Sequence, residues 1–231
     1  MSLLDDDDKR SVNWVLYLGI GVLTVIVIGV AWYILNQKKY DSATLCEEDS
    51  TSFSSVILID KTGGFTSNHE RILSSAIDAE IAKLTTGKRL TVFEVDDNLY
   101  EGLSKPVFDK CKPKSGNAVN QLIENKQMID KNFNISFQDK IRSIFSHLDE
   151  SDEAKSSPIL ESLSDISSLY AIAPNLNLEK LIIISDLLQH SNNVSFYQDA
   201  AINIKHDGIS PLIPDLFGVN VQIYWVQRKN R

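Results

Sequence analysis

An uncharged stretch from Val12 to Leu35 limits what this chain can fold into more than any other feature of its sequence. At ~1.5 Å rise per residue, a helix of this length reaches about 36 Å, enough to cross the ~30 Å hydrocarbon core of a bilayer. Aromatic residues mark both ends, where rings are expected among lipid headgroups: Trp14, Tyr17, Trp32 and Tyr33. The sequence therefore predicts one transmembrane helix at 12–35.

A cleaved signal peptide is the alternative for an apolar segment at this place in a chain. The run is longer than the ~7–15 residues of a signal-peptide core, and no small-x-small cleavage site follows it, which favours an uncleaved anchor. Charge leaves the orientation open, because two basic residues lie on each side of the run: Lys9 and Arg10, Lys38 and Lys39. The DDDDK run before the helix matches a protease tag site, and we assign it no function.

The rest of the chain suits one folded domain. We expect an N-terminal tail at 1–11, the transmembrane helix at 12–35, a polar tether at 36–53 and a single domain at 54–231. The chain has 23 Lys and Arg against 31 Asp and Glu, a net charge of −8. Such a surface repels phosphate backbones, so nucleic-acid binding is not expected.

Two cysteines are too few for a zinc site of four thiolates. Cys46 lies just before the first expected strand and Cys111 in the loop after the second, so neighbouring strands could bring them together in a disulfide. Two unrelated thiols are the alternative. A bridge would favour a domain outside the cytoplasm, periplasmic or extracellular, because disulfides persist in oxidising compartments.

Short apolar, β-branched runs alternate with helical patterns after the tether. Strands are expected at 54–60, 89–95, 178–186 and 221–227. Helices are expected at 69–84, at 135–148, at 158–173 and in a piece that ends near 204. For the helix at 158–173, Ser156 or Ser157 is expected as the cap, with Pro158 in the first turn. No element is assigned within 96–131.

Strands separated by helices predict an α/β fold with an open, mostly parallel, Rossmann-like sheet flanked by helices. In such sheets ligands bind beyond the carboxyl ends of the strands. Asp60 ends the first expected strand and Asp186 the third, so both could face one crevice. The alternative is that each aspartate caps the helix after its strand.

Two hydroxyl groups accompany these aspartates. Thr62 lies two residues beyond Asp60, and Ser157 starts a helix whose preceding loop could reach the same edge. Carboxylates, hydroxyls and bound water form an oxygen-only set, which suits Mg²⁺ or Mn²⁺ far better than zinc or copper. We therefore expect a metal site at this edge.

At these residues the chain resembles a von Willebrand factor type A domain. The metal-ion-dependent adhesion site of that family combines Asp-x-Ser-x-Ser, a Thr in a later loop and an Asp after a buried strand. ILIDKTGGF is similar to the first segment, with Asp60 and Thr62 on its first acid and first hydroxyl. SSPILESL places Ser157 at the threonine, and LIIISDLLQ supplies Asp186. The likeness covers roughly 54–227 in order and spacing.

The chain also departs from the family pattern. Gly64 stands where the family has its second serine, and Leu187 replaces the glycine of Thr-Asp-Gly. The lost serine removes one direct oxygen ligand, which water or a backbone carbonyl could replace, because Mg²⁺ commonly retains several waters. Only four strands are clear, so the sheet is either trimmed or has another strand within 96–131.

The resemblance implies a docking module, in which a partner's carboxylate completes the coordination of the metal and no bond is made or broken. We therefore expect a non-enzymatic, single-pass membrane protein that binds a protein partner through a Mg²⁺-dependent site: Asp60, Thr62, Ser157 and Asp186. One alternative is a structural subunit of a membrane complex with a vestigial metal site. Another is a Mg²⁺-dependent phosphohydrolase with Asp60 as nucleophile, although the second acid two residues on is missing.

Overall fold

The computed structural model describes residues 5–36, 38–48, 50–95, 103, 105–116, 125–146, 148, 154–191, 194–196 and 212–228. The chain divides into two compact units, Met1–Lys39 and Tyr40–Arg231. The boundaries of tail, tether and domain expected from the sequence stay predictions. Within the expected tether, the described residues of 40–47 form a turn in which the Asp41 carboxylate accepts the backbone N–H groups of Ala43 and Thr44.

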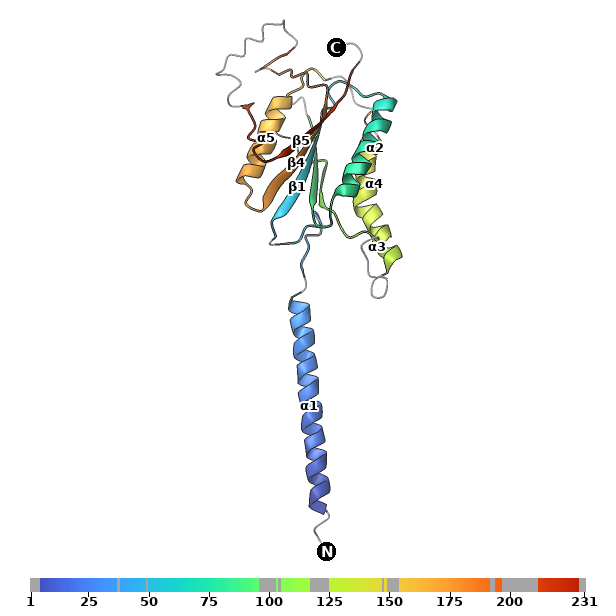
Figure 1. Ribbon diagram of the computed structural model, residues 1–231, viewed down its shortest axis with the longest axis vertical. Coiled ribbons are helices and arrows are strands. Elements are labelled where there is room, and N and C mark those ends of the chain that lie inside the picture. The colour runs from blue at the N-terminus through green and yellow to red at the C-terminus, as the bar shows by residue number, and fades with distance from the viewer. Residues whose placement is uncertain are drawn as a thin grey trace. The chain divides into compact units, whose positions relative to one another are not determined.

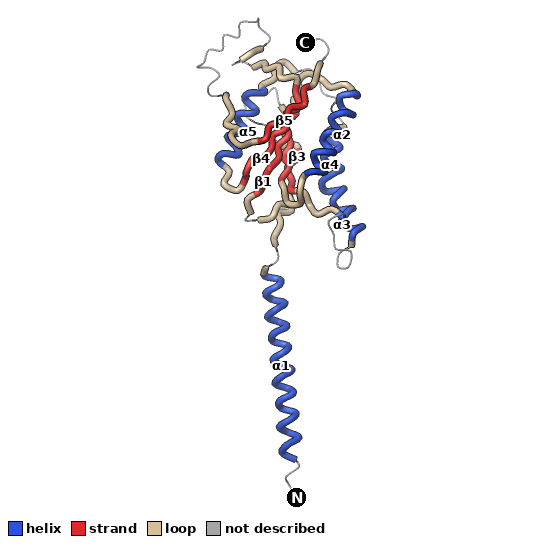
Figure 2. The backbone as a smooth tube through the Cα atoms, in the orientation of Figure 1, coloured by secondary structure: helices blue, strands red, loops and turns tan. Residues whose placement is uncertain are grey.

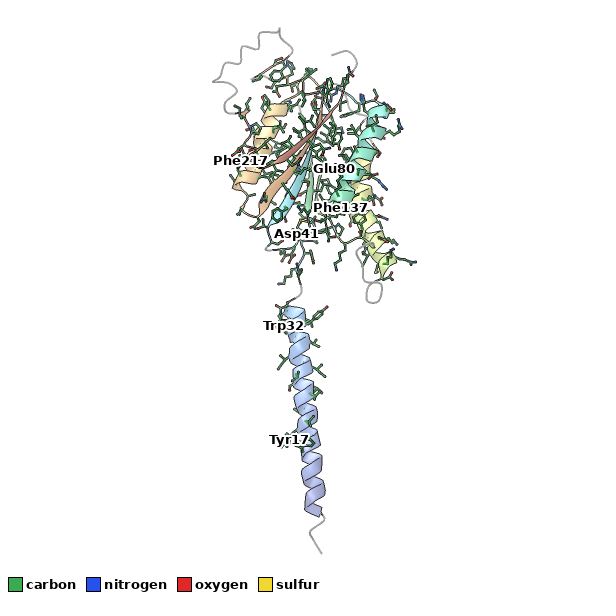
Figure 3. The ribbon with its side chains drawn as sticks, viewed as in Figure 1. Tyr17, Trp32, Asp41, Glu80, Phe137 and Phe217 are labelled. Atoms are coloured by element: carbon green, nitrogen blue, oxygen red, sulfur yellow. A yellow bond between two sulfur atoms is a disulfide. The ribbon has the colours of Figure 1, made fainter. Side chains whose placement is uncertain are left out.

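The described part of the first unit is one helix, α1 (Asp5–Leu35). Its stretch Leu16–Leu35 is long and apolar enough to cross a membrane. Tyr17 and Trp32 project from it and are 71% and 68% exposed (Figure 3). A signal sequence near an N-terminus passes the same test of length and composition. The helix expected at 12–35 is present, and its place in a membrane is a proposal.

Five strands form the sheet of the second unit, in the order β3-β2-β1-β4-β5, and the neighbours β1, β4 and β5 are labelled in Figure 1. Their bounds are β1 Ser52–Ile59, β2 Arg89–Glu94, β3 Phe108–Cys111, β4 Leu176–Ser185 and β5 Asn220–Trp225. Neighbouring strands pair parallel, except that β2 and β3 are antiparallel. The open, mostly parallel α/β sheet is therefore confirmed, and β3 is an additional strand within 96–131.

Helices lie on both faces of this sheet (Figure 2). On one face lie α2 (Ser67–Lys83) and α4 (Asp139–Phe145), and on the other lies α5 (Ile159–Ile172). A further helix, α3 (Lys126–Phe133), continues through a π-helical turn (Asn134–Gln138) into α4. The helices expected at 69–84, 135–148 and 158–173 are thus present, the second with this π-helical start. The piece expected to end near 204 lies outside the described residues.

Two apolar clusters attach the helices to the sheet. Alternate residues of β1 point to opposite faces, so Ile57 and Ile59 join the cluster under α2 and α4, whereas Val56 and Leu58 join the cluster under α5. Phe137, labelled in Figure 3, is fully buried in the first of these clusters. Burial on both faces explains why β1 reads as a continuous apolar run.

The start of α5 differs from the expectation. Its N-cap is Pro158, with no hydrogen bond from a side chain of the cap residue, rather than Ser156 or Ser157. The Leu160 backbone N–H instead donates to Gln189 Oε1 at 2.9 Å. A side chain from the loop after β4 thereby satisfies one of the free N–H groups of the helix terminus, and the Ser157 hydroxyl makes a different contact.

A disulfide joins Cys46 and Cys111, whose Cα atoms lie 4.9 Å apart. Cys111 is the last residue of β3 rather than part of a loop. Its backbone N–H donates to the Thr44 carbonyl at 2.7 Å, so the turn at 40–47 is also hydrogen-bonded to β3. The bridge therefore links the segment before β1 to an edge strand of the sheet, at the end where the parallel strands begin.

Candidate functional site

Asp60 and Asp186 lie at the same edge of the sheet. Each follows the last residue of its strand, and β1 and β4 are parallel neighbours. The Asp60 backbone N–H donates to the Ile184 carbonyl at 2.9 Å, which extends the β1–β4 pairing up to the site. Both side chains are buried: Asp60 is 1% exposed and Asp186 8% exposed. The topology thus brings together two acids that are far apart in the sequence.

The Asp60 carboxylate accepts hydrogen bonds on both oxygens. Oδ1 accepts the Thr62 hydroxyl at 2.5 Å and the Thr62 backbone N–H at 3.0 Å. The Ser157 hydroxyl donates to the same oxygen at 3.3 Å. Oδ2 accepts the Ser185 hydroxyl at 2.7 Å. Three of the four residues expected at the site, Asp60, Thr62 and Ser157, are therefore in direct contact.

Ser157 is held at this place by the loop after β4. Its backbone N–H donates to the His190 carbonyl at 2.6 Å, and the His190 N–H donates to the Ser157 carbonyl at 2.9 Å. This two-residue bridge fixes the loop before α5 against the loop after β4. The hydroxyl of Ser157 can therefore reach Asp60 across 97 residues of sequence.

Asp186, the fourth expected residue, meets the others through an arginine. Its Oδ1 accepts the Leu188 backbone N–H at 3.0 Å. Its Oδ2 lies 3.2 Å from Nη1 of Arg228, without the angles of a hydrogen bond. The pairing is electrostatic, and it connects Asp186 to Asp60 because Arg228 also contacts that residue.

Arg228 follows β5 by three residues, and its side chain is 4% exposed. Nη2 donates to the Asp60 carbonyl at 2.6 Å and lies 3.4 Å from Asp60 Oδ2. One guanidinium therefore contacts both buried carboxylates through different nitrogen atoms. It also lies 5.5 Å from the centre of the Phe65 ring, within the range of a cation–π contact.

Gly63 makes room for this guanidinium. A Cβ atom at Gly63 would lie 2.0 Å from Arg228 Nη1, closer than atoms can approach. The family resemblance placed Thr62 and Gly64 in the ligand segment, and the residue between them is the one that accommodates Arg228. The absence of a side chain at position 63 is thus tied to the arginine.

The described residues do not fit a resident Mg²⁺ or Mn²⁺. Both oxygens of Asp60 already accept hydrogen bonds, and the guanidinium contacts the two carboxylates that a divalent ion would have to share. The site instead contains its own cation, and two carboxylates with one guanidinium leave a net charge of −1.

Sequence reasoning missed Ser185 and Arg228. Ser185 lies inside the expected third strand, next to Asp186, and gave no signal of its own. Arg228 stands in a basic C-terminal QRKNR segment, which is typical of a solvated tail. The available signal was indirect, because two buried acids need a compensating positive charge and Arg228 directly follows the strand expected at 221–227.

Sequence comparison finds no matching family model and no matching curated relative. Among solved structures, the chain is similar to a von Willebrand factor type A protein from Catenulispora acidiphila, with 17% identity and a TM-score of 0.33 over 61% of this chain. It is also similar to the human COPII-coat protein Sec24c, with 10% identity and a TM-score of 0.40 over 76% of this chain. The chain spans only 28% and 29% of the lengths of these two proteins.

Proposed function

We propose that this chain is a single-pass, membrane-anchored interaction module that binds a protein partner at the carboxyl-end edge of its sheet and catalyses no reaction. The observation that carries the proposal is Trp225, which is 69% exposed at that edge beside a sealed ionic cluster. The class of protein is that of von Willebrand factor A-like domains, as the order of Asp60, Thr62, Ser157 and Asp186 in the sequence suggests.

The state of Asp60 argues against the phosphohydrolase alternative. A nucleophilic carboxylate needs an oxygen that can reach a substrate. Asp60 is 1% exposed, and its two oxygens accept hydrogen bonds from three side chains. Arg228 covers it further, so a substrate phosphoryl group could reach it only after the whole cluster came apart. A binding function needs no such opening.

Exposed apolar side chains surround this edge. The Trp225 indole Nε1 donates to the Asp186 carbonyl at 3.3 Å, which fixes the ring next to the cluster. Leu187, 39% exposed, comes directly after Asp186. Ile223 and Val221 continue the exposed side of β5 from Trp225 back toward the start of the strand, and they are 49% and 40% exposed. A tryptophan held by one hydrogen bond and flanked by aliphatic groups is typical of the centre of a protein interface.

The apolar helix and the disulfide together support a cellular location for the domain. Leu16–Leu35 has the length and composition of a transmembrane helix. The Cys46–Cys111 bridge persists in oxidising compartments. Together they support an anchored domain on the outer, periplasmic or extracellular side, where a second membrane component is within reach.

Two forms of docking follow from the sequence, and the geometry favours one of them. In the Mg²⁺-dependent form, a partner's carboxylate would complete the coordination of a metal held by Asp60 and Asp186. In the other form, the chain is a structural subunit whose metal site is vestigial. Because Arg228 already pairs with both carboxylates, we propose the second form, in which the partner binds around Trp225 without a metal.

Crosslinking of the full-length protein in its native membrane tests this function. A photo-reactive residue at position 225 is expected to give one discrete protein adduct that persists in EDTA. The same residue at position 217 serves as the matched control, because Phe217 is aromatic and 97% exposed (Figure 3) but precedes β5 at the other end of the strand. Equal adducts at both positions, or an adduct abolished by EDTA, would contradict the proposal. Alkaline extraction that releases the protein from membranes would contradict the anchor.

A further inference from the structure

The buried cluster holds two carboxylates and one guanidinium. Asp60 and Asp186 are almost fully removed from solvent. A buried carboxylate is strongly destabilising unless an opposite charge and hydrogen bonds compensate it. Hydroxyl and backbone N–H groups donate hydrogen bonds to the Asp60 carboxylate. In contrast, Asp186 Oδ2 has no hydrogen-bond partner among the described residues. The cation supplied by Arg228 is therefore essential to this arrangement.

The guanidinium is also positioned as a specific part of the structure. The Asp60 carbonyl accepts one of its N–H groups, the Phe65 ring lies 5.5 Å from it in a cation–π contact, and Gly63 leaves space for it. Asp60, Gly63 and Phe65, all from the loop between β1 and α2, thus form the binding pocket of the guanidinium. The cation itself comes from the other end of the sequence, after β5.

We propose that Arg228 is a built-in cation that closes a latent divalent-cation site formed by Asp60 and Asp186. Without the guanidinium, the two carboxylates and the hydroxyls of Thr62, Ser157 and Ser185 present only oxygen atoms. Such a set is what Mg²⁺ and Mn²⁺ prefer. The arginine and a divalent ion exclude one another, because both must contact the same carboxylates.

This arrangement gives the site two mutually exclusive states. With Arg228 in place, the protein is indifferent to Mg²⁺. Replacement of Arg228 would remove the cation and leave an oxygen-lined site at the edge that also bears Trp225. This inference extends beyond docking, since it concerns the ion-binding state of the cluster and needs no partner.

Mn²⁺ titration of the full-length protein in detergent, followed by electron paramagnetic resonance, tests the inference. The wild type is expected to bind no Mn²⁺ up to about 1 mM. Arg228→Ala is expected to bind one Mn²⁺ per chain, and Arg228→Ala combined with Asp186→Ala is expected to lose it. Equal Mn²⁺ binding by the wild type and Arg228→Ala would overturn the inference, and so would the absence of binding in an Arg228→Ala protein that circular dichroism shows to be folded.

A second variant covers the case in which Arg228→Ala does not fold. Arg228→Gln removes the charge but retains much of the side-chain volume. Its melting temperature in EDTA is expected to lie below that of the wild type and to rise when about 5 mM Mg²⁺ is added, because a ligand that binds only the folded state stabilises it. The wild type is expected to show no such rise. A rise in both proteins, or in neither, would overturn the inference and leave the crosslinking result at position 225 unaffected.

Discussion

The two ends of the sheet are held together by different means. Where the parallel strands begin, a covalent bond between Cys46 and Cys111 connects the segment before β1 to β3. Where they finish, Arg228 connects the carboxylates after β1 and β4 by charge alone. Both links join parts that are far apart in the sequence.

The two links differ in what is needed to open them. The disulfide opens only by reduction, so the starting end is permanent in an oxidising compartment. The ionic cluster involves no covalent bond, and under our proposal a divalent ion can take the place of its cation. A domain with a covalent lock at one end and an exchangeable charge at the other is suited to responding at the second end only.

Loss of the disulfide is expected to have the largest effect. Cys46→Ser combined with Cys111→Ser opens a loop with a sequence separation of 65 residues. The chain-entropy model predicts a loss of about 4 kcal/mol in the free energy of unfolding. Urea unfolding of the oxidised wild type and the double variant measures it. A loss below about 1 kcal/mol would mean that the starting end does not depend on the covalent link.

Removal of one donor from the ionic cluster is expected to have an intermediate effect. Ser185 is fully buried, donates to Asp60 and accepts the Leu187 N–H at 2.8 Å. Ser185→Ala is expected to cost about 2 kcal/mol, because a hydrogen bond to a charged group is stronger than one between neutral groups.

Ser162→Ala provides the matched control for that variant. Ser162 is also buried, but its hydroxyl donates to a neutral acceptor, the Pro158 carbonyl, at 2.9 Å. Its loss is expected to cost about 1 kcal/mol. If Ser162→Ala and Ser185→Ala lowered the free energy of unfolding equally in thermal unfolding, the claim that charge stabilises the carboxyl-end edge of the sheet would be wrong.

The smallest effect is expected from Glu80 on α2 (Figure 3), which lines a pocket together with residues near the starts of the strands, among them Lys88 and Asn220. Burial raises the pKa of the Glu80 carboxyl, but hydrogen bonds from Lys180 and Lys83 outweigh burial, so the pKa lies below its ordinary value of 4.5. The lowered pKa stabilises the fold fully above about pH 4.5, and this stabilisation disappears as the pH falls through the folded-state pKa.

The test compares wild type with Glu80→Gln by thermal unfolding at pH 7 and pH 3. A partly exposed ion pair contributes about 1 kcal/mol, so the wild type is expected to be slightly more stable at pH 7. The two proteins are expected to converge at pH 3. A gap that stays constant between the two pH values would show that the Glu80 charge contributes nothing.

Much of the fold could be predicted from local pattern. The strand expected at 54–60 corresponds to β1 because residues buried on both faces form an unbroken apolar run. The edge strand β3 was not predictable, because FDKC is short and two of its four residues are only half-buried. The cap of α5 was misassigned because the group that satisfies Leu160 comes from Gln189, far along the chain.

The candidate site was predictable in its acids but not in its cation. Strand ends are local features, so Asp60 and Asp186 could be placed at one edge from sequence alone. Arg228 depends on β5 pairing with β4, in which Ser185 lies opposite Trp225. This strand pairing determines that Arg228, just after β5, reaches the buried carboxylates. Local sequence does not encode such a pairing.

The position of the disulfide has a mechanical consequence. If the proposed partner at Trp225 pulled against the proposed membrane anchor, tension would enter the domain from the segment before β1. At Cys46 this load would divide, part going along the backbone into β1 and part crossing the bridge into β3. The sheet would then be loaded in shear across several strands at once, instead of being unzipped from β1 one hydrogen bond at a time.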